Sequence, residues 1–241
     1  MTTITIRRQL SAAILPLDGF TGQALGQRVL CELDGVPLAR PVWKRDGWLI
    51  LTDLVPGEHR LALRCPGFQS REISLSGDVR TEETVALNPG RGYAFPPDTA
   101  FLFLTLSGSP EARTQILAGM DSPRQFKLMR EAKAGDSAVK IFLRGDAPRP
   151  GCFLLCGKTT EAVFFRRVTI DGDAETASPL TEAHKRGDAL IPARSFLVAA
   201  GETIKIPFRD SGTAHLFCHG QLKTLALQAG EKRNLEWNLE A

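Results

Sequence analysis

The sequence predicts an all-β protein made of small antiparallel β-sandwiches in tandem. The chain has 22 glycines and 15 prolines in 241 residues, and they divide it into short segments. Most of these segments alternate apolar and polar side chains, which places the apolar residues on one face of a strand. No long stretch shows a helical period of 3.6, although Glu111, Ala112 and Gln115 leave a short helix over residues 110–117 open.

The first 90 residues contain about seven such segments, enough for a complete small sandwich. Turn residues separate them, for example Asp34-Gly35 between the second segment and the third. The expected strands cover residues 12–17, 28–33, 42–43, 48–51, 59–65, 70–75 and 83–87.

Residues 53–68 show the pattern most clearly. Pro56-Gly57 forms a turn, because Pro presets φ at the first central position and Gly supplies the positive φ of the second. From His59 onward the polarity alternates. We therefore expect the face of the strand that carries Leu61, Leu63 and Cys65 to point into a core.

Two motifs in this region resemble the carboxypeptidase regulatory-like domain, a small prealbumin-like (transthyretin-like) β-sandwich. One is Asp53-Leu54-x-Pro56-Gly57-x-His59, followed by the strand and Pro66-Gly67-Phe68. The other is Asp18-Gly19-x-Thr21-Gly22-x-x-Leu25, which matches the loop that joins the first two strands in that family. The resemblance implies a prealbumin-like scaffold for residues 1–90, of the kind that often serves as an accessory or spacer unit. A scaffold of this kind hosts many unrelated functions.

A linker is expected after the first sandwich, at residues 88–92 and Pro96-Pro97. We divide the chain into a sandwich over residues 1–90, a middle sandwich-like domain over 93–167 and a C-terminal sandwich over 168–241. The last two could also share one core. Further strands are expected at residues 100–106, 114–118, 125–131, 138–144, 151–156 and 162–170.

The C-terminal part repeats landmarks of the first. Leu63-x-Cys65-x-Gly67 recurs 153 residues later as Leu216-x-Cys218-x-Gly220, and Asp18-Gly19 recurs at the same interval as Asp171-Gly172. A nearly constant interval across several landmarks favours a duplication. Cys65 and Cys218 should then be buried at equivalent positions of two separate sandwiches.

Composition excludes several classes of protein. A net charge of +3, from 30 basic and 27 acidic residues, is too balanced for a nucleic-acid-binding protein. Residues 1–8 alternate rather than form a signal peptide, and no apolar run approaches the ~18 residues of a membrane span. The five cysteines are an odd number, so we expect free thiols in a reduced, cytoplasmic protein.

Two metal sites can be considered, and the residues argue against both. His215 and His219 share one face of their strand whereas Cys218 points to the other, so the three cannot bind one zinc ion. Cys152 and Cys156 lie on another strand. The spacing of Asp171, Asp173, Glu175 and Glu182 mimics a calcium loop, but Thr176 replaces the required glycine. We expect no metal and no cofactor.

Catalytic motifs are also missing from the sequence. Nucleophile elbows, zinc-protease helices and phosphate-binding loops do not occur. Prealbumin-like hydroxyisourate hydrolases end in Tyr-Arg-Gly-Ser, whereas this chain ends in Asn238-Leu239-Glu240-Ala241. Intradiol dioxygenases need two tyrosines, and this chain has one, Tyr93. We therefore expect no catalytic residues and no enzymatic activity; an enzyme whose site is assembled between domains is the alternative.

The hairpin at residues 43–48 is the candidate binding site. Trp43 and Trp48 flank the basic tip Lys44-Arg45, which suggests an aromatic platform for a sugar or a hot spot for a protein partner. Alternatively, the two indoles pair across the hairpin and cover its core. The function we expect is a structural or protein-interaction module with protein partners, as in a subunit of a larger bacterial or phage-like assembly. A carbohydrate- or small-ligand-binding protein that uses sandwich loops is the alternative.

Overall fold

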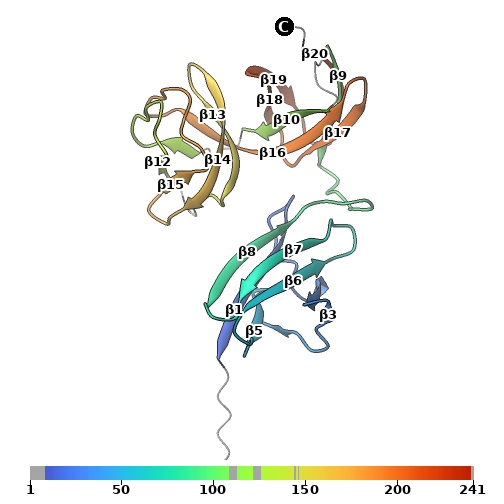
Figure 1. The fold of residues 1–241 in the computed structure, drawn as a ribbon. Coiled ribbons are helices and arrows are strands. Elements are labelled where there is room, and N and C mark those ends of the chain that lie inside the picture. Colours follow the sequence, from blue (N-terminus) through green and yellow to red (C-terminus); the bar gives the residue numbers. More distant parts are fainter. Residues whose placement is uncertain (1–8, 109–112, 122–125, 144, 146, 240–241) are drawn as a thin grey trace, which may run out of the picture. The chain divides into compact units, whose positions relative to one another are not determined.

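The computed structural model describes residues 9–108, 113–121, 126–143, 145 and 147–239 (Figure 1). They form an all-β protein with several sheets, which confirms the predicted fold class. The chain divides into two compact units, Met1–Phe95 and Pro96–Ala241. No helix within the described ranges is long and apolar enough to cross a membrane.

Unit 1 is a sandwich of two four-stranded sheets with the strand orders β4-β5-β1-β8 and β3-β2-β6-β7. All strand pairs are antiparallel except β1 with β8, which run parallel. The strands are β1 (Leu10–Asp18), β2 (Leu30–Leu33), β3 (Val36–Pro37), β4 (Val42–Trp43), β5 (Leu49–Thr52), β6 (Glu58–Arg64), β7 (Arg71–Ser76) and β8 (Thr81–Leu87), with one 3-10 turn at Gly26–Arg28.

The core of unit 1 lies between these two sheets. Ile14 and Leu49 enter it from the first sheet, and Leu61 and Leu63 from the second, each with 0% of its surface exposed. Cys65 lies beside them, just after β6, and is also buried. The inward face predicted for residues 59–65 is therefore confirmed.

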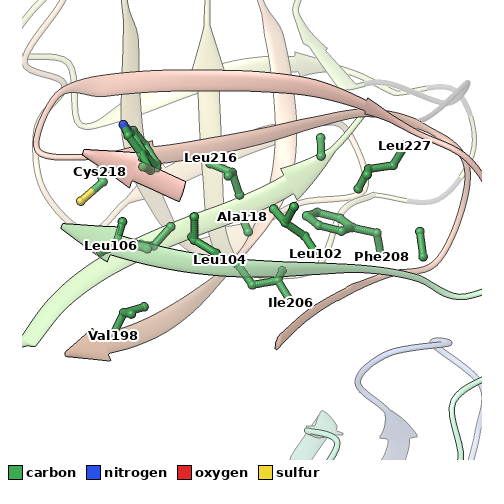
Figure 2. Close-up of a cluster of buried hydrophobic side chains, with 14 of the residues drawn as sticks. Leu102, Leu104, Leu106, Ala118, Val198, Ile206, Phe208, Leu216, Cys218 and Leu227 are labelled. Carbon is green, nitrogen blue, oxygen red and sulfur yellow. The ribbon is translucent and has the colours of Figure 1, made fainter. Parts of the chain in front are cut away.

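Unit 2 contains a second sandwich, formed by strands from both ends of its sequence. One sheet has the order β17-β9-β20, and the other side is formed by β10, β18, β19 and the end of β16. Leu102, Leu104 and Leu106 of the first sheet face Ala118 and Leu216 of the second (Figure 2). The strands are β9 (Ala100–Ser107), β10 (Arg113–Met120), β16 (Ala189–Ala199), β17 (Thr203–Phe208), β18 (Gly212–Cys218), β19 (Gln221–Leu227) and β20 (Lys232–Asn238).

The remaining strands of unit 2 form a closed antiparallel barrel with the order β11-β12-β15-β14-β13-β16. Pairing between β11 and β16 closes it, and Phe165, Leu155 and Leu190 fill its interior. Closure leaves no free edge around the ring. The barrel strands are β11 (Phe126–Leu128), β12 (Ala138–Phe142), β13 (Gly151–Cys156), β14 (Thr160–Val168) and β15 (Asp173–Thr176).

Strand β16 belongs to both the barrel and the sandwich. Its first residues pair with β13, up to Pro192 opposite Phe153, and its later residues pair with β10 from Ala193 onward. Pro192 lies where the partner changes, and a proline there costs little because its position lacks a continuous ladder of hydrogen bonds.

Apart from β4, which has no counterpart in the second, the two sandwiches have the same topology. β1 pairs in parallel with β8 and antiparallel with β5, just as β9 pairs in parallel with β20 and antiparallel with β17. The order β3-β2-β6-β7 likewise corresponds to β16-β10-β18-β19. The barrel occupies the connection between β10 and β16, where unit 1 has only the turn Asp34-Gly35.

This nested arrangement differs from the domain boundaries expected from the sequence. A boundary at 167/168 would separate β14 from β15, which pair and share the barrel core. Residues 93–241 contain two large cores, and the sandwich core takes β9 and β10 from the expected middle domain. The helix considered over residues 110–117 is wrong where the chain is described, because β10 begins at Arg113; residues 110–112 lie outside the described ranges.

The repeated landmarks separate into a matching and a non-matching pair. Cys65 and Cys218 are both buried and belong to separate cores, as predicted. They lie at the C-terminal ends of the corresponding strands β6 and β18. Asp171-Gly172, however, lies between β14 and β15 of the barrel, whereas Asp18 ends β1, whose counterpart is β9. The interval of 153 residues between those two motifs is therefore coincidental.

Candidate functional site

The hairpin predicted as a binding site joins β4 to β5. Trp43 pairs with Leu49, and the Lys44 N–H donates to the Trp48 carbonyl at 2.8 Å. This register places Trp43 on the face of Leu49, which is the core face, and Trp48 on the opposite face. Trp43 packs against the unit 1 core and both indoles are half-buried, whereas Lys44 and Arg45 are exposed. The two rings therefore do not share one platform.

A second polar site holds the turn before β6. His59 is 8% exposed, and its Nδ1 lies 2.7 Å from Asp34 Oδ2 while its Nε2 lies 2.9 Å from the Val55 carbonyl. Both ring nitrogens face acceptors, so the imidazolium form can donate to both. The hydrogen bond to Asp34, followed by the one to Val55, raises the pKa of His59, and the same contact with His59 lowers the pKa of Asp34.

Two hydrogen bonds hold the turn to the residues that follow β7. The Gly57 N–H donates to Asp78 Oδ2 at 3.1 Å, and the Gly77 N–H donates to the Gly57 carbonyl at 2.8 Å. A Cβ on Gly77 would lie 1.8 Å from the Val55 carbonyl oxygen, so only glycine fits there. The Pro56-Gly57-x-His59 motif therefore links the turn before β6 to the loops that contain Asp34 and Gly77-Asp78.

A third polar site lies where the chain leaves unit 1. The Asp18 carboxylate accepts from the Phe20 N–H at 2.7 Å, the Thr21 N–H at 3.0 Å and the Tyr93 hydroxyl at 2.6 Å. Burial alone would raise the pKa of Asp18, but the hydrogen bonds, first that from Tyr93, outweigh it and hold the pKa below its usual value.

Aromatic packing strengthens this attachment. The ring of Tyr93 lies edge-on to Phe68 at 5.0 Å and to Phe95 at 4.7 Å, and Phe20 contacts Phe95 at 5.2 Å. Such pairs contribute about 0.5–1.5 kcal/mol each beyond burial. Residues 88–92, the first part of the predicted linker, and the following Tyr93 and Phe95 are thus packed onto unit 1 rather than extended away from it.

A fourth polar site links barrel strand β14 to the segment between β15 and β16. His184 is 2% exposed and lies between two carboxylates, with Nε2 2.9 Å from Glu161 and Nδ1 3.3 Å from Asp188. The other oxygen of Glu161 accepts from the Thr181 N–H at 2.9 Å and from its hydroxyl at 2.7 Å. Burial would raise the pKa of Glu161, but the bonds from Thr181 and His184 lower it below its usual value.

The barrel and the second sandwich meet in a small core of their own. Leu117 of β10, Leu154 of β13 and Ile191 of β16 are buried together there. Gly119 makes this approach possible, because a Cβ on it would lie 2.8 Å from both Ile191 Cγ2 and the Pro192 carbonyl oxygen.

The rim of this junction carries polar and half-buried groups. Cys152 and Cys156 are half-buried beside Leu154, and burial raises the pKa of both thiols. His215 Nε2 lies 3.0 Å from Asp121 Oδ1, which is an ion-pair distance, although the two groups are not aligned as a hydrogen bond.

The residues weighed as metal ligands are dispersed. Cys218 faces the sandwich core while His215 lies on the other face of β18, and His219 follows in a turn. Asp173 and Glu175 lie in β15, where Asp173 forms a 3.0 Å ion pair with Lys140. Over the described ranges, no three His, Cys, Asp or Glu side chains converge as a metal site.

Strands β8 and β20 are two of the sheet edges that remain as candidate binding surfaces. β8 and β20 each end the order of their sheets, and each has seven residues without proline. Glu82 is exposed on β8, and Lys232 and Arg233 are exposed on β20. Sequence reasoning had missed both edges, because the sequence does not show which strand ends a sheet.

Comparisons with known proteins identify no family. No family model matches the chain, and no curated protein matches it. Among solved structures, the chain is similar to the major pilin subunit of Bacillus cereus, with 9% identity, 95% of this chain and 99% of that chain covered, and a TM-score of 0.25. It is also similar to the Bacillus anthracis TIE protein, with 9% identity, 96% and 50% covered, and a TM-score of 0.25. At TM-scores of 0.25, neither similarity supports a conclusion about the function of this chain.

Proposed function

We propose that this chain is a non-catalytic structural or protein-interaction module that serves as a subunit of a larger assembly. The observation that supports this proposal is the use of the buried acids and histidines. Asp18, His59, Glu161 and His184 each bind two or more groups of the chain itself, at 2.6–3.3 Å. Their partners are mostly loops, so these groups hold the loops that connect the strands. Side chains used in this way rigidify a scaffold.

Stability measurements can separate this role from catalysis without knowledge of a substrate. Replacement of a catalytic group commonly raises stability, because active sites sacrifice stability for function. Replacement of an anchoring group lowers it. We expect Glu161→Gln and His59→Gln to lower the melting temperature. Glu182→Gln, an exposed acid on the same loop as His184, is the matched control and should leave it unchanged. A higher melting temperature for Glu161→Gln would overturn the anchoring role.

The interaction part of the proposal requires a complex in the native cells. Chemical cross-linking of the tagged chain at its natural abundance, followed by native electrophoresis, should place most of it in a complex larger than its own 26.3 kDa. Migration of the whole population as an isolated monomer would contradict an assembly role.

We also propose that unit 1 belongs to the carboxypeptidase regulatory-like domains. The roles of its two motifs support this assignment. Asp18 holds the loop after the first strand and the segment that leaves the unit. His59 holds the Pro56-Gly57 turn through Val55. A crystal structure of unit 1 that superposes poorly on that family would refute the assignment.

A further inference from the structure

Three loops meet at the end of unit 1 where β6 begins. The Asp34-Gly35 turn follows β2, the Pro56-Gly57 turn precedes β6, and Gly77-Asp78 follows β7. Because β6 pairs antiparallel with both β2 and β7, these loops come to the same end of the sheet. An exposed valine lies in or beside each loop, namely Val36, Val55 and Val79 with exposed fractions of 66%, 65% and 64%.

The ring of His59 links two of these loops through atoms that accept hydrogen bonds. Its Nδ1 lies 2.7 Å from Asp34 Oδ2, and its Nε2 lies 2.9 Å from the Val55 carbonyl oxygen. Contact with His59 lowers the pKa of Asp34, so this carboxylate is ionised near neutral pH and only accepts. The imidazolium therefore donates to both loops at once, whereas a neutral imidazole has a single N–H and donates to one of them.

The charges around His59 determine which of the two hydrogen bonds a neutral ring keeps. Asp34 has the largest effect on the ring, and Asp78, on the loop between β7 and β8, adds a weaker electrostatic attraction. Glu58 and Arg60 flank His59 on β6 but point to the opposite face of the strand. The residue of β7 that pairs with His59 carries no charge.

A hydrogen bond to a carboxylate is stronger than one to a carbonyl group. A neutral ring should therefore keep its proton on Nδ1, opposite Asp34. The lone pair of Nε2 then faces the Val55 carbonyl oxygen, and two acceptors at 2.9 Å repel each other. The start of this loop has a separate attachment, because the Leu54 N–H donates to Ser11 Oγ of β1 at 3.0 Å. Loss of the proton should thus free the turn after Leu54 and leave the preceding residues in place.

We propose that His59 is a pH-sensitive latch, which holds the Pro56-Gly57 turn in place while its ring is protonated and releases the turn when the proton is lost. The hydrogen bonds to Asp34 and Val55 raise the pKa of His59, so the release occurs above the ordinary value of ~6.5. It changes the shape of the exposed end of unit 1 that Val55 helps to form. This inference goes beyond the proposed function, which requires the contacts of His59 but no response to pH.

The ring nitrogens of His59 report the latch directly in the wild-type chain. Nitrogen NMR of the isotope-labelled protein from about pH 5.5 to about pH 9 covers the transition. We expect an imidazolium at the acidic end and, at the alkaline end, the neutral tautomer that is protonated on Nδ1. A neutral ring protonated on Nε2 would overturn the proposal, because that tautomer keeps its hydrogen bond to Val55.

Hydrogen exchange measures the release of the turn itself. The Gly57 N–H donates to Asp78, and the Gly77 N–H donates to the Gly57 carbonyl. Protection of these two amides, corrected for the intrinsic effect of pH, should fall by about two- to ten-fold as His59 loses its proton, which corresponds to one hydrogen bond. The Leu54 amide should keep its protection. In His59→Gln the protection of both glycine amides should not depend on pH. Constant protection in wild type would contradict the latch.

Asp34→Asn tests the origin of the pH at which the latch opens. Removal of this carboxylate should move the midpoint of the His59 titration down toward ~6.5, because Asp34 is the main cause of the raised pKa. Glu72→Gln, an exposed acid on β7, is the matched control and should leave the midpoint unchanged. An Asp34→Asn midpoint equal to that of wild type would refute the latch. Its failure would leave the proposed function standing, because that depends on melting temperatures and on the complex in native cells.

Discussion

The hydroxyl of Tyr93 donates a 2.6 Å hydrogen bond to the carboxylate of Asp18, 75 residues earlier in the chain. The bond ties the segment that leaves unit 1 to the loop that follows its first strand. Phe68 and Phe95 pack on the same tyrosine ring. The exit from unit 1 is therefore part of its folded structure.

Tyr93→Phe should lower the free energy of unfolding by about 1.5–3 kcal/mol, the usual contribution of a hydrogen bond to a charged group. Ring packing is kept, so the loss isolates the hydroxyl. The folded pKa of Asp18 lies below its unfolded value, so this stabilisation is present above the unfolded pKa of ~3.9 and disappears as pH falls through the folded value. Urea unfolding of the full chain should show the difference at neutral pH and a smaller one in acid. Equal stabilities at neutral pH would contradict the assignment.

His59→Gln should change the pH dependence of stability. The folded pKa of His59 is raised, so its stabilisation is fully present below the unfolded value of ~6.5 and disappears as pH rises through the folded value. The difference between wild type and variant should therefore be larger at about pH 5.5 than at about pH 9. His219→Asn, an exposed turn residue with φ of 46°, is the control, because asparagine tolerates this conformation. A difference that grows toward high pH would show that the assigned contacts are wrong.

Gly119→Ala should destabilise the junction of the barrel and the second sandwich. The new Cβ would lie 2.8 Å from the Pro192 carbonyl oxygen, and backbone atoms cannot move aside cheaply. Overpacking of this kind costs about 1–3 kcal/mol. Thr224→Ala, an exposed position in the same cross-strand row beyond His215, should change the melting temperature little. Similar melting temperatures for the two variants would contradict the close packing of Ile191 on Gly119.

The thiols should react with a bulky alkylating reagent in two groups. Cys152 and Cys156 are half-buried and should be labelled first. Cys31, Cys65 and Cys218 are buried, and burial raises the pKa of Cys31 to about 11, which further reduces its thiolate fraction. Mass spectrometry of peptides from the native protein would measure the order. Rapid labelling of Cys65 or Cys218 would contradict their places in the two cores.

The two hairpin tryptophans should differ in their contribution to stability. Trp43 packs against the unit 1 core, so Trp43→Ala should cost about 1–3 kcal/mol. Trp48 lies on the other face of the hairpin, so Trp48→Ala should cost clearly less. Thermal unfolding of both variants gives the comparison. A larger loss for Trp48→Ala would instead support indoles that pair across the hairpin.

The sequence by itself determined the strands and the faces they bury. Alternation is a local property, so Leu61, Leu63 and Cys65 could be assigned to a core without knowledge of their neighbours. The same reasoning placed His215 and Cys218 on opposite faces of one strand. Cys218 was also recognised as the counterpart of Cys65, because the hairpins β6–β7 and β18–β19 keep their contacts within one short stretch of chain.

Only the tertiary structure decided which strands pair across long stretches of sequence. β9 meets β20 although 124 residues lie between Ser107 and Lys232, and alternation says nothing about so distant a partner. The inserted barrel was hidden for this reason, and a matching interval at Asp171 suggested the wrong counterpart for Asp18. The loop anchors were hidden as well, because His184 and Glu161 lie 23 residues apart in the sequence and meet only through the fold of the barrel. Local side-chain patterns encode burial, whereas pairing depends on the packing of the whole chain.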